Sequence, residues 1–256
     1  MTVFHVEPSV GEDGSRRFHV KQAAGREHMT EVQQVPLDVV ERVFGDRAPL
    51  AIKFTAMLAD HGVERGLIGP REVDRLWDRH VLNSAVLSEL VPADCRVVDV
   101  GSGAGLPGIP LAIARPDLRL TLLEPMARRV AWLEEVVETL GLAVDVVRGR
   151  AEEPPVRQRL GGSDVVTARA VAPMERLAAW CLPLARPGGQ LLALKGASAA
   201  EELARDAKAV SKAGGSRQRV VSCGDAVLEV PTTVVVVERD ESAGRRDGGR
   251  RRRKDG

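Results

Sequence analysis

The feature that most constrains the fold is a short apolar run that leads directly into a turn with three glycines. Residues 96–100 read Arg-Val-Val-Asp-Val, and Gly101, Gly103 and Gly105 follow at alternate positions. A β-branched run of this length is typical of a buried strand, and glycine permits a positive φ and the close approach of a ligand to the backbone. The apolar segment 106–114 then reads as a helix, whose N-terminus offers N–H donors. The sequence therefore predicts a strand, a ligand-binding turn and a helix.

Strand-like and helix-like segments alternate along the chain that follows. The expected strands cover residues 118–123, 144–147, 164–168, 190–194 and 233–237. The expected helices cover residues 127–140, 174–184 and 201–213. Such alternation predicts an α/β fold with a doubly wound, mostly parallel, Rossmann-like sheet, whose ligand crevice lies at the carboxyl ends of its strands.

Four segments of different character divide the chain. Residues 1–35 show no sustained period, and we expect a disordered tail there. Residues 36–91 have helical periodicity and predict a small helical cap, and residues 92–240 carry the α/β pattern. Residues 241–256 hold seven Arg and Lys against three Asp and Glu, in a chain of net charge +1. This segment predicts a second disordered tail, which is either inert or an electrostatic handle for RNA.

Composition excludes several classes of protein. Cys95, Cys181 and Cys223 lie far apart with no C-x-x-C pair, which argues against a disulfide framework or a zinc site and suits the reducing cytoplasm. No run of about 18 apolar residues is present, so we expect no membrane span. Aromatic residues make up 3% of the chain, and none is Tyr. A surface that binds nucleic acid mainly by base stacking is therefore not expected.

The residues alone leave two ligands open for the glycine turn. No Gly-Lys-Ser/Thr follows it, which excludes a P-loop. Residues 103–108 satisfy the G-x-G-x-x-G pattern of nicotinamide dinucleotide sites. Asp99, directly before the turn, instead suits the ammonium group of S-adenosylmethionine. Glu124 ends the next strand, where its carboxylate can accept hydrogen bonds from the ribose hydroxyls of either ligand.

With residues 99–110, Asp-Val-Gly-Ser-Gly-Ala-Gly-Leu-Pro-Gly-Ile-Pro, the chain resembles the RsmG family, also called glucose-inhibited division protein B. Four further segments agree in the same order: residues 79–84, 124–129, 168–172 and 193–196. One segment departs from the family pattern, because Gly66-Leu67-Ile68-Gly69 stands where an Asn-Leu-Thr stretch is usual.

The resemblance implies a class I methyltransferase with a seven-stranded sheet and S-adenosylmethionine as cofactor. It also implies methylation of N7 of one guanine, position 527 in the 530 loop of 16S rRNA of the small ribosomal subunit. We expect a monomer, although the sequence itself does not reveal the oligomeric state. Guanine N7 carries a lone pair and no proton, so this reaction needs no general base, only positioning and electrostatic support. The sequence agrees in lacking Tyr, and hence any Asn-Pro-Pro-Tyr motif for exocyclic amino groups.

Candidate site residues follow from the strand ends and from the resemblance. Arg169 is expected to contact the cofactor or to hold the target base, and Lys195 to contact an RNA phosphate. His80 lies on an apolar helical face, where a core histidine is more common than a catalytic one, and the sequence leaves both roles open. No metal site is expected. The expected cofactor-binding residues are Gly101, Gly103, Gly105, Leu106, Glu124, Ala151, Glu152 and Arg169. The alternatives are a nicotinamide-dependent oxidoreductase and an RNA-binding protein without catalytic activity.

Overall fold

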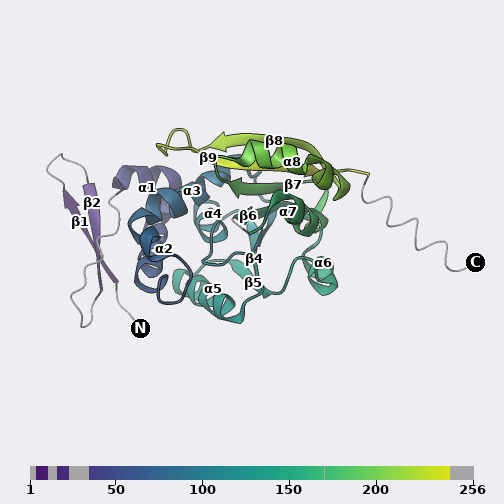
Figure 1. The fold of residues 1–256 in the computed structure, drawn as a ribbon. Helices are drawn as coiled ribbons and strands as arrows, with labels where there is room; N and C mark the ends of the chain where they lie inside the picture. Colours follow the sequence, from purple (N-terminus) through teal and green to yellow (C-terminus); the bar gives the residue numbers. More distant parts are fainter. Residues whose placement is uncertain (1–3, 11–15, 23–34, 170, 243–256) are drawn as a thin grey trace, which may run out of the picture.

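The computed structural model describes residues 4–10, 16–22, 35–169 and 171–242 (Figure 1). The larger of its two sheets has seven strands in the order β5-β4-β3-β6-β7-β9-β8. β3 to β7 run parallel, and β9 pairs antiparallel with both β7 and β8. The predicted α/β fold with a mostly parallel sheet is thus confirmed. The strands are β3 (Arg96–Val100), β4 (Arg119–Glu124), β5 (Val144–Arg148), β6 (Ser163–Arg169), β7 (Ala185–Lys195), β8 (Gly215–Cys223) and β9 (Thr232–Arg239).

Helices cover both faces of this sheet because alternate strand residues point to opposite sides. In β3, Val97 packs in one cluster with side chains of α4 (Gly108–Ala114) and α5 (Ala127–Leu140). Its neighbour Val98 packs into a second cluster on the other face. That cluster includes side chains of α6 (Pro154–Leu160), α7 (Met174–Cys181) and α8 (Ala199–Lys212).

The segment before β3 is helical, as its periodicity predicts. It contains α1 (Leu37–Phe44), α2 (Ala48–His61), the 3-10 helix η2 (Pro70–Arg75), the π-helix η3 (Leu76–Leu82), α3 (Asn83–Ala85) and the 3-10 helix η4 (Val86–Leu90). Pro70 starts the second half of this segment, where its missing N–H leaves no helical bond unmade. Two further 3-10 turns are η1 (Gly45–Arg47) and η5 (Leu182–Leu184).

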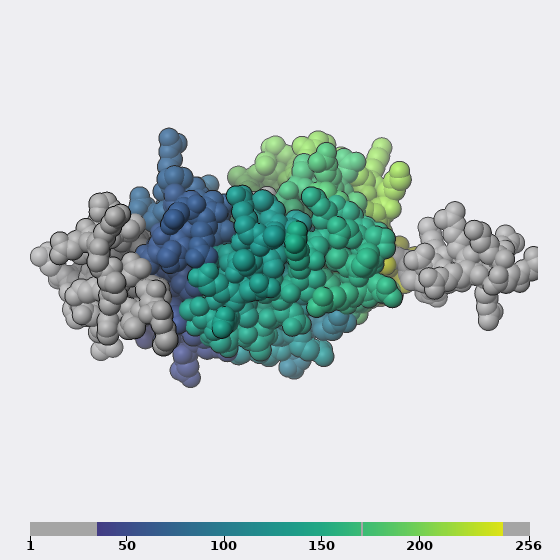
Figure 2. Space-filling model, turned by 90° about the horizontal axis from the view of Figure 1, so that it is seen from below, coloured from purple at the N-terminus to yellow at the C-terminus, as the bar shows by residue number. Residues whose placement is uncertain are grey.

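The cap and the sheet share one hydrophobic core. Phe54 and Trp77 of the cap are buried in the same cluster as Leu111 of α4 and Trp132 of α5. Figure 2 shows the blue cap and the teal to green residues of the sheet region as one continuous surface. Buried side chains of residues 36–91 and of residues 92–240 belong to one cluster, so the core does not separate the two segments. The predicted boundary between them stays a prediction.

The N-terminal region differs from the expected disordered tail in two places. β1 (Phe4–Val10) and β2 (Arg16–Gln22) pair antiparallel in register from Phe4 opposite Gln22 to Val10 opposite Arg16. Apolar and polar residues alternate in both segments, a period of two that is short enough to be missed in a search for sustained patterns. Most of the predicted basic tail, residues 243–256, lies outside the described residues. Within the described ranges, no helix combines the length and hydropathy needed to cross a membrane.

Candidate functional site

A cavity of about 580 Å³ lies between the cap and the carboxyl ends of the parallel strands. β3, β4, β5 and β6 reach it with the residues at or just after their ends, and the cap reaches it with the 67–69 loop, η2 and η3. The chain changes direction across the sheet between β3 and β6, and ligands of α/β proteins bind at such a point. The ligand crevice that the sequence predicts at the strand ends is therefore present as a cavity, and the cap forms one of its sides.

The glycine turn forms one wall of this cavity. Gly101 and Gly103 line the cavity and have φ values of 71° and 55°, a region that residues with a side chain rarely adopt. The turn is held from behind, because the indole Nε1 of Trp132 donates to the carbonyl of Ala104 at 3.0 Å. Leu106 also lines the cavity, as predicted for a cofactor contact. Gly105 does not, and its missing side chain instead makes room for Ile109, 2.7 Å from where a Cβ would lie.

Glu124 lies at the end of β4 with its carboxylate in the cavity wall. The residue is 1% exposed. Its Oε2 accepts the N–H of Gly103 at 2.9 Å, and its Oε1 accepts the N–H of Met126 at 3.0 Å. Each carboxylate oxygen has a second lone pair, so both can still accept a hydroxyl hydrogen. This arrangement fits the two hydroxyls of a ribose, which the sequence predicted for Glu124.

Asp99 has a different place from the one that the sequence argument gave it. It is fully buried and does not line the cavity. Its Oδ1 accepts the hydroxyl of Thr167 at 2.9 Å, and its Oδ2 accepts the N–H of Gly108 at 3.2 Å. Burial raises the pKa of this carboxyl to about 6. Asp99 thus joins β3, β6 and the start of α4, and it offers no contact to a ligand's ammonium group.

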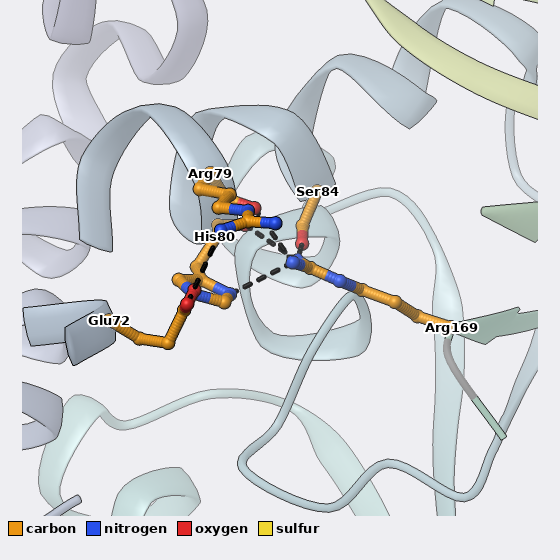
Figure 3. Close-up of polar contacts among 5 residues, drawn as sticks. All are labelled: Glu72, Arg79, His80, Ser84 and Arg169. Carbon is orange, nitrogen blue, oxygen red and sulfur yellow. Dashed lines mark hydrogen bonds and ion pairs between the residues drawn. The ribbon is translucent and has the colours of Figure 1, made fainter. Parts of the chain in front are cut away.

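Arg169 reaches from the end of β6 across the cavity to the cap (Figure 3). Its Nη1 donates to Oγ of Ser84 at 3.0 Å and to the carbonyl of His80 at 3.3 Å. Its Nη2 donates to the carbonyl of Arg79 at 2.7 Å and contacts Nδ1 of His80 at 2.8 Å. Burial lowers the pKa of this guanidinium to about 10, so it keeps its charge at neutral pH. All four contacts are to neutral groups, which leaves the positive charge available to the cavity.

His80 connects Arg169 to a carboxylate. Because an arginine can only donate, Nδ1 of His80 must accept, and the ring proton then lies on Nε2. Nε2 is 2.7 Å from Oε2 of Glu72, which accepts this proton (Figure 3). Burial, aided by the nearby charge of Arg169, lowers the pKa of His80, while the hydrogen bond from His80 lowers the pKa of Glu72. The result is a chain of hydrogen bonds from Glu72 through a neutral His80 to Arg169.

Sequence reasoning placed His80 in the core and did not single out Glu72. His80 is partly buried, but it lines the cavity together with Glu72. No single helical period links the two residues, because Glu72 lies on the 3-10 helix η2 and His80 on the π-helix η3. Three further lining residues were not singled out from the sequence: Arg129 and Val171, which lie in segments that carry the family resemblance, and Trp180.

The remaining predicted residues divide into two groups. Ala151 and Glu152, after β5, line the cavity as expected. Lys195, at the end of β7, does not line it. Its ammonium group donates to the carbonyl of Ala172 at 2.8 Å and to Oε1 of Glu202 at 2.9 Å, with 11% of the side chain exposed. The phosphate contact of Lys195 stays a prediction, and the described contacts favour a role within the protein.

The cavity wall fits S-adenosylmethionine on its chemistry. Glu124 supplies acceptors for a ribose, and Leu106 and Ala151 supply apolar surface beside it. The backbone of Gly101 and Gly103 is open to close approach. Over the described ranges, no group of three His, Cys, Asp or Glu side chains is arranged to hold a metal ion.

The chain is similar to known proteins both in sequence and in fold. The family profile described as "rRNA small subunit methyltransferase G" matches residues 47–230. Ribosomal RNA small subunit methyltransferase G of Rhodococcus jostii is 54% identical over 237 residues, 93% of this chain and 96% of that protein. The protein of the same name from Salinispora tropica is 58% identical, over 77% of this chain and 84% of its own. Among solved structures, the mitomycin 7-O-methyltransferase MmcR shares the fold, with a TM-score of 0.51 at 20% identity over 72% of this chain and 60% of its own.

Proposed function

Because the chain belongs to the family of rRNA small subunit methyltransferase G, we propose that it uses S-adenosylmethionine to methylate a guanine of 16S rRNA at N7. The guanine is the one at position 527 of the 530 loop that the sequence resemblance implies. The observation that carries this proposal is a single cavity with an acceptor pair for a ribose on one wall and a buried, charged guanidinium on another. The two groups are Glu124 and Arg169, and both line that cavity.

The reaction asks little acid–base chemistry of the protein. Bound in the cavity, S-adenosylmethionine would supply a methyl group on a positively charged sulfur, which the N7 lone pair of guanine can attack in line. His80 is not needed as a base, and its ring is engaged on both nitrogens by Glu72 and Arg169. The protein's task is to hold the two reactants in line and to stabilise charge, which accounts for large rate factors in such transfers.

We assign roles to the chain's own residues on this basis. Glu124 binds the ribose hydroxyls through its free lone pairs, and the Gly101–Gly103 backbone lies against the methionine part of the cofactor. Ala151 and Glu152 bound the adenine side. Arg169 orients the guanine, because its hydrogen bonds to the cap fix the guanidinium in one place beside the cavity. Arg169 is therefore the proposed catalytic residue.

The proposed partner is the small ribosomal subunit, so the proposed place of action is the cytoplasm. We further propose that the protein acts as a monomer. The two alternatives from the sequence predict different results. An oxidoreductase must bind a nicotinamide dinucleotide, and an RNA-binding protein without catalytic activity would transfer no methyl group.

Transfer of a labelled methyl group to rRNA tests the function directly. Small subunits and naked 16S rRNA from cells lacking this protein are incubated with it and with S-[methyl-³H]adenosylmethionine. Strand scission at 7-methylguanine after borohydride and aniline treatment then maps the product. We expect one modified guanine, at position 527. Label at any other nucleotide, or none on either substrate, would refute the proposal, and calorimetry with NADH is expected to show no binding.

A further inference from the structure

One cavity-lining cation is not used by the protein itself. Arg129 lies in the first turn of α5, and it lines the cavity beside the glycine turn. Its Nε is buried without a hydrogen-bond partner, and no residue in the described ranges forms an ion pair with its guanidinium. Its Nη1 is 3.9 Å from the point where a Cβ on Gly103 would lie. The guanidinium therefore stands directly over the backbone that Glu124 holds in place.

A buried polar group without a partner is unfavourable, and more so when it carries a charge. Arg169, which also lines the cavity, has four partners of its own. Arg129 is half-buried, and its Nε has no partner within the described residues, so a ligand in the cavity that brings an acceptor would supply the missing contact. The acceptor must suit a planar, permanently charged donor, and a carboxylate or a phosphate does so best.

We propose that Arg129 binds the carboxylate of the methionine part of S-adenosylmethionine. The inference rests on the proposed function, since it takes the cofactor from there. Of the cofactor's polar groups, the ribose hydroxyls are matched by Glu124, and the sulfonium and ammonium groups repel a guanidinium. The carboxylate is the single anionic group that remains. A phosphate of the rRNA would meet the same need, but the place of Arg129 beside Gly103, inside the cofactor's half of the cavity, favours the carboxylate.

This role also separates Arg129 from its neighbour on the same helix turn. Arg128 is exposed and does not line the cavity. The two side chains carry equal charge at adjacent positions, so a long-range electrostatic effect on a ligand would be similar for both. A direct contact to the carboxylate would be lost only with Arg129. Arg128→Gln is therefore the matched control for Arg129→Gln.

The test is a double-mutant cycle between the protein and the ligand. Calorimetry measures the binding of S-adenosylhomocysteine, and of its decarboxylated analogue S-adenosyl-3-thiopropylamine by displacement, to wild type, Arg129→Gln and Arg128→Gln. We expect Arg129→Gln to weaken S-adenosylhomocysteine about 10-fold or more, which is about 1.4 kcal/mol. The same variant should leave the affinity for the analogue within about 2-fold, so that binding of the analogue shows an intact site. Arg128→Gln should change neither affinity.

Three outcomes would overturn the inference. The first is that wild type binds the two ligands with the same affinity. The second is that Arg129→Gln loses affinity equally for both ligands. The third is that the control Arg128→Gln loses as much affinity for S-adenosylhomocysteine as Arg129→Gln does. A loss confined to rRNA binding, with a lower salt dependence, would assign Arg129 to a phosphate instead. If wild type binds neither adenosyl ligand, it is the proposed function that fails, and the two failures are thus distinguishable.

Discussion

Nη2 of Arg169 lies 2.8 Å from Nδ1 of His80, a residue 89 positions earlier in the chain. The contact joins the end of β6 to the helical cap across the cavity. The guanidinium also donates to Ser84 and to two cap carbonyls, so four hydrogen bonds set its orientation. The cap is therefore part of the site's construction, since it holds the group that we assign to the target base.

Replacing Arg169 is expected to affect transfer more than binding. Arg169→Ala should lower the single-turnover rate constant at saturating rRNA and cofactor by about 10²-fold, equal to about 2.7 kcal/mol of transition-state stabilisation. Arg169→Lys should recover little of this loss, because an ammonium group cannot reach the four acceptors that the planar guanidinium joins. Full activity of Arg169→Ala in this assay would remove the residue from the catalytic role.

The hydrogen-bond chain predicts a pH dependence on the acid side. Protonated His80 cannot accept from Arg169, so the rate constant should fall when His80 gains a proton. Burial lowers the pKa of His80, which puts this fall below the usual histidine value of about 6.5. The hydrogen bond to Glu72 opposes that shift, and Glu72→Gln should therefore lower the pKa of His80 further. Single-turnover rates measured as a function of pH should show the fall moving to lower pH in Glu72→Gln. A profile unchanged by the substitution would contradict a coupling through His80.

Glu124 is expected to recognise the ribose. Glu124→Ala should weaken S-adenosylmethionine binding by about 1.5–3 kcal/mol, the range for hydrogen bonds to a charged group. The backbone N–H groups of Gly103 and Met126 lose their acceptor as well, which adds to the effect. A 2′-deoxy analogue of the cofactor should bind wild type more weakly than the parent compound, and this difference should nearly vanish in the variant. Equal discrimination by both proteins would show that the carboxylate does not contact the ribose.

Two glycines of the same turn and helix should give opposite phenotypes. Gly103→Ala places a Cβ with no close contact, but at a φ of 55° that costs about 1–2 kcal/mol. The turn should rearrange to relieve this strain, so cofactor affinity should fall while the melting temperature changes little. Gly108→Ala puts a Cβ against Leu122 and 2.8 Å from Oδ2 of Asp99, and should destabilise the fold by about 1–3 kcal/mol. Calorimetry measures the cofactor affinity of both variants, and thermal melts measure their stability. Lower stability in Gly103→Ala with normal cofactor affinity would contradict the prediction.

Lys195 and Glu202 are expected to act as a pair. Lys195 donates to the carbonyl of Ala172, and Glu202 accepts the N–H of Met174, so together they hold the segment after β6. Lys195→Met and Glu202→Gln should each lower the single-turnover rate constant about 10-fold. The double variant should lower it no further than Lys195→Met alone. The salt dependence of rRNA binding should match that of the control Lys208→Met, at an exposed position on α8. If Lys195→Met alone lowers the salt slope by about 0.7–0.9 units, the phosphate contact drawn from the sequence is supported instead.

Local pattern determined much of this protein. The strand ending at Val100, the glycine turn and the strand ending at Glu124 are each set by neighbours in the chain, through alternation and through the positive φ that glycine accepts. For the same reason the α/β fold and the cavity at the strand ends were predictable. Leu106, Ala151 and Glu152, for which the family resemblance implies cofactor contacts, line that cavity.

Tertiary structure decided which side chains face the cavity. Asp99 and Gly105 belong to the same motif as Gly101, yet neither lines the cavity, because Asp99 pairs with Thr167 and Gly105 packs on Ile109. Glu72 enters the site only because the cap folds against the strand ends, and Arg129 is notable only because burial leaves its Nε without a partner. Burial and pairing depend on segments that are far apart in the chain and close in space. The pattern of apolar and polar residues in one segment does not show which distant segments pack against that segment in the folded protein.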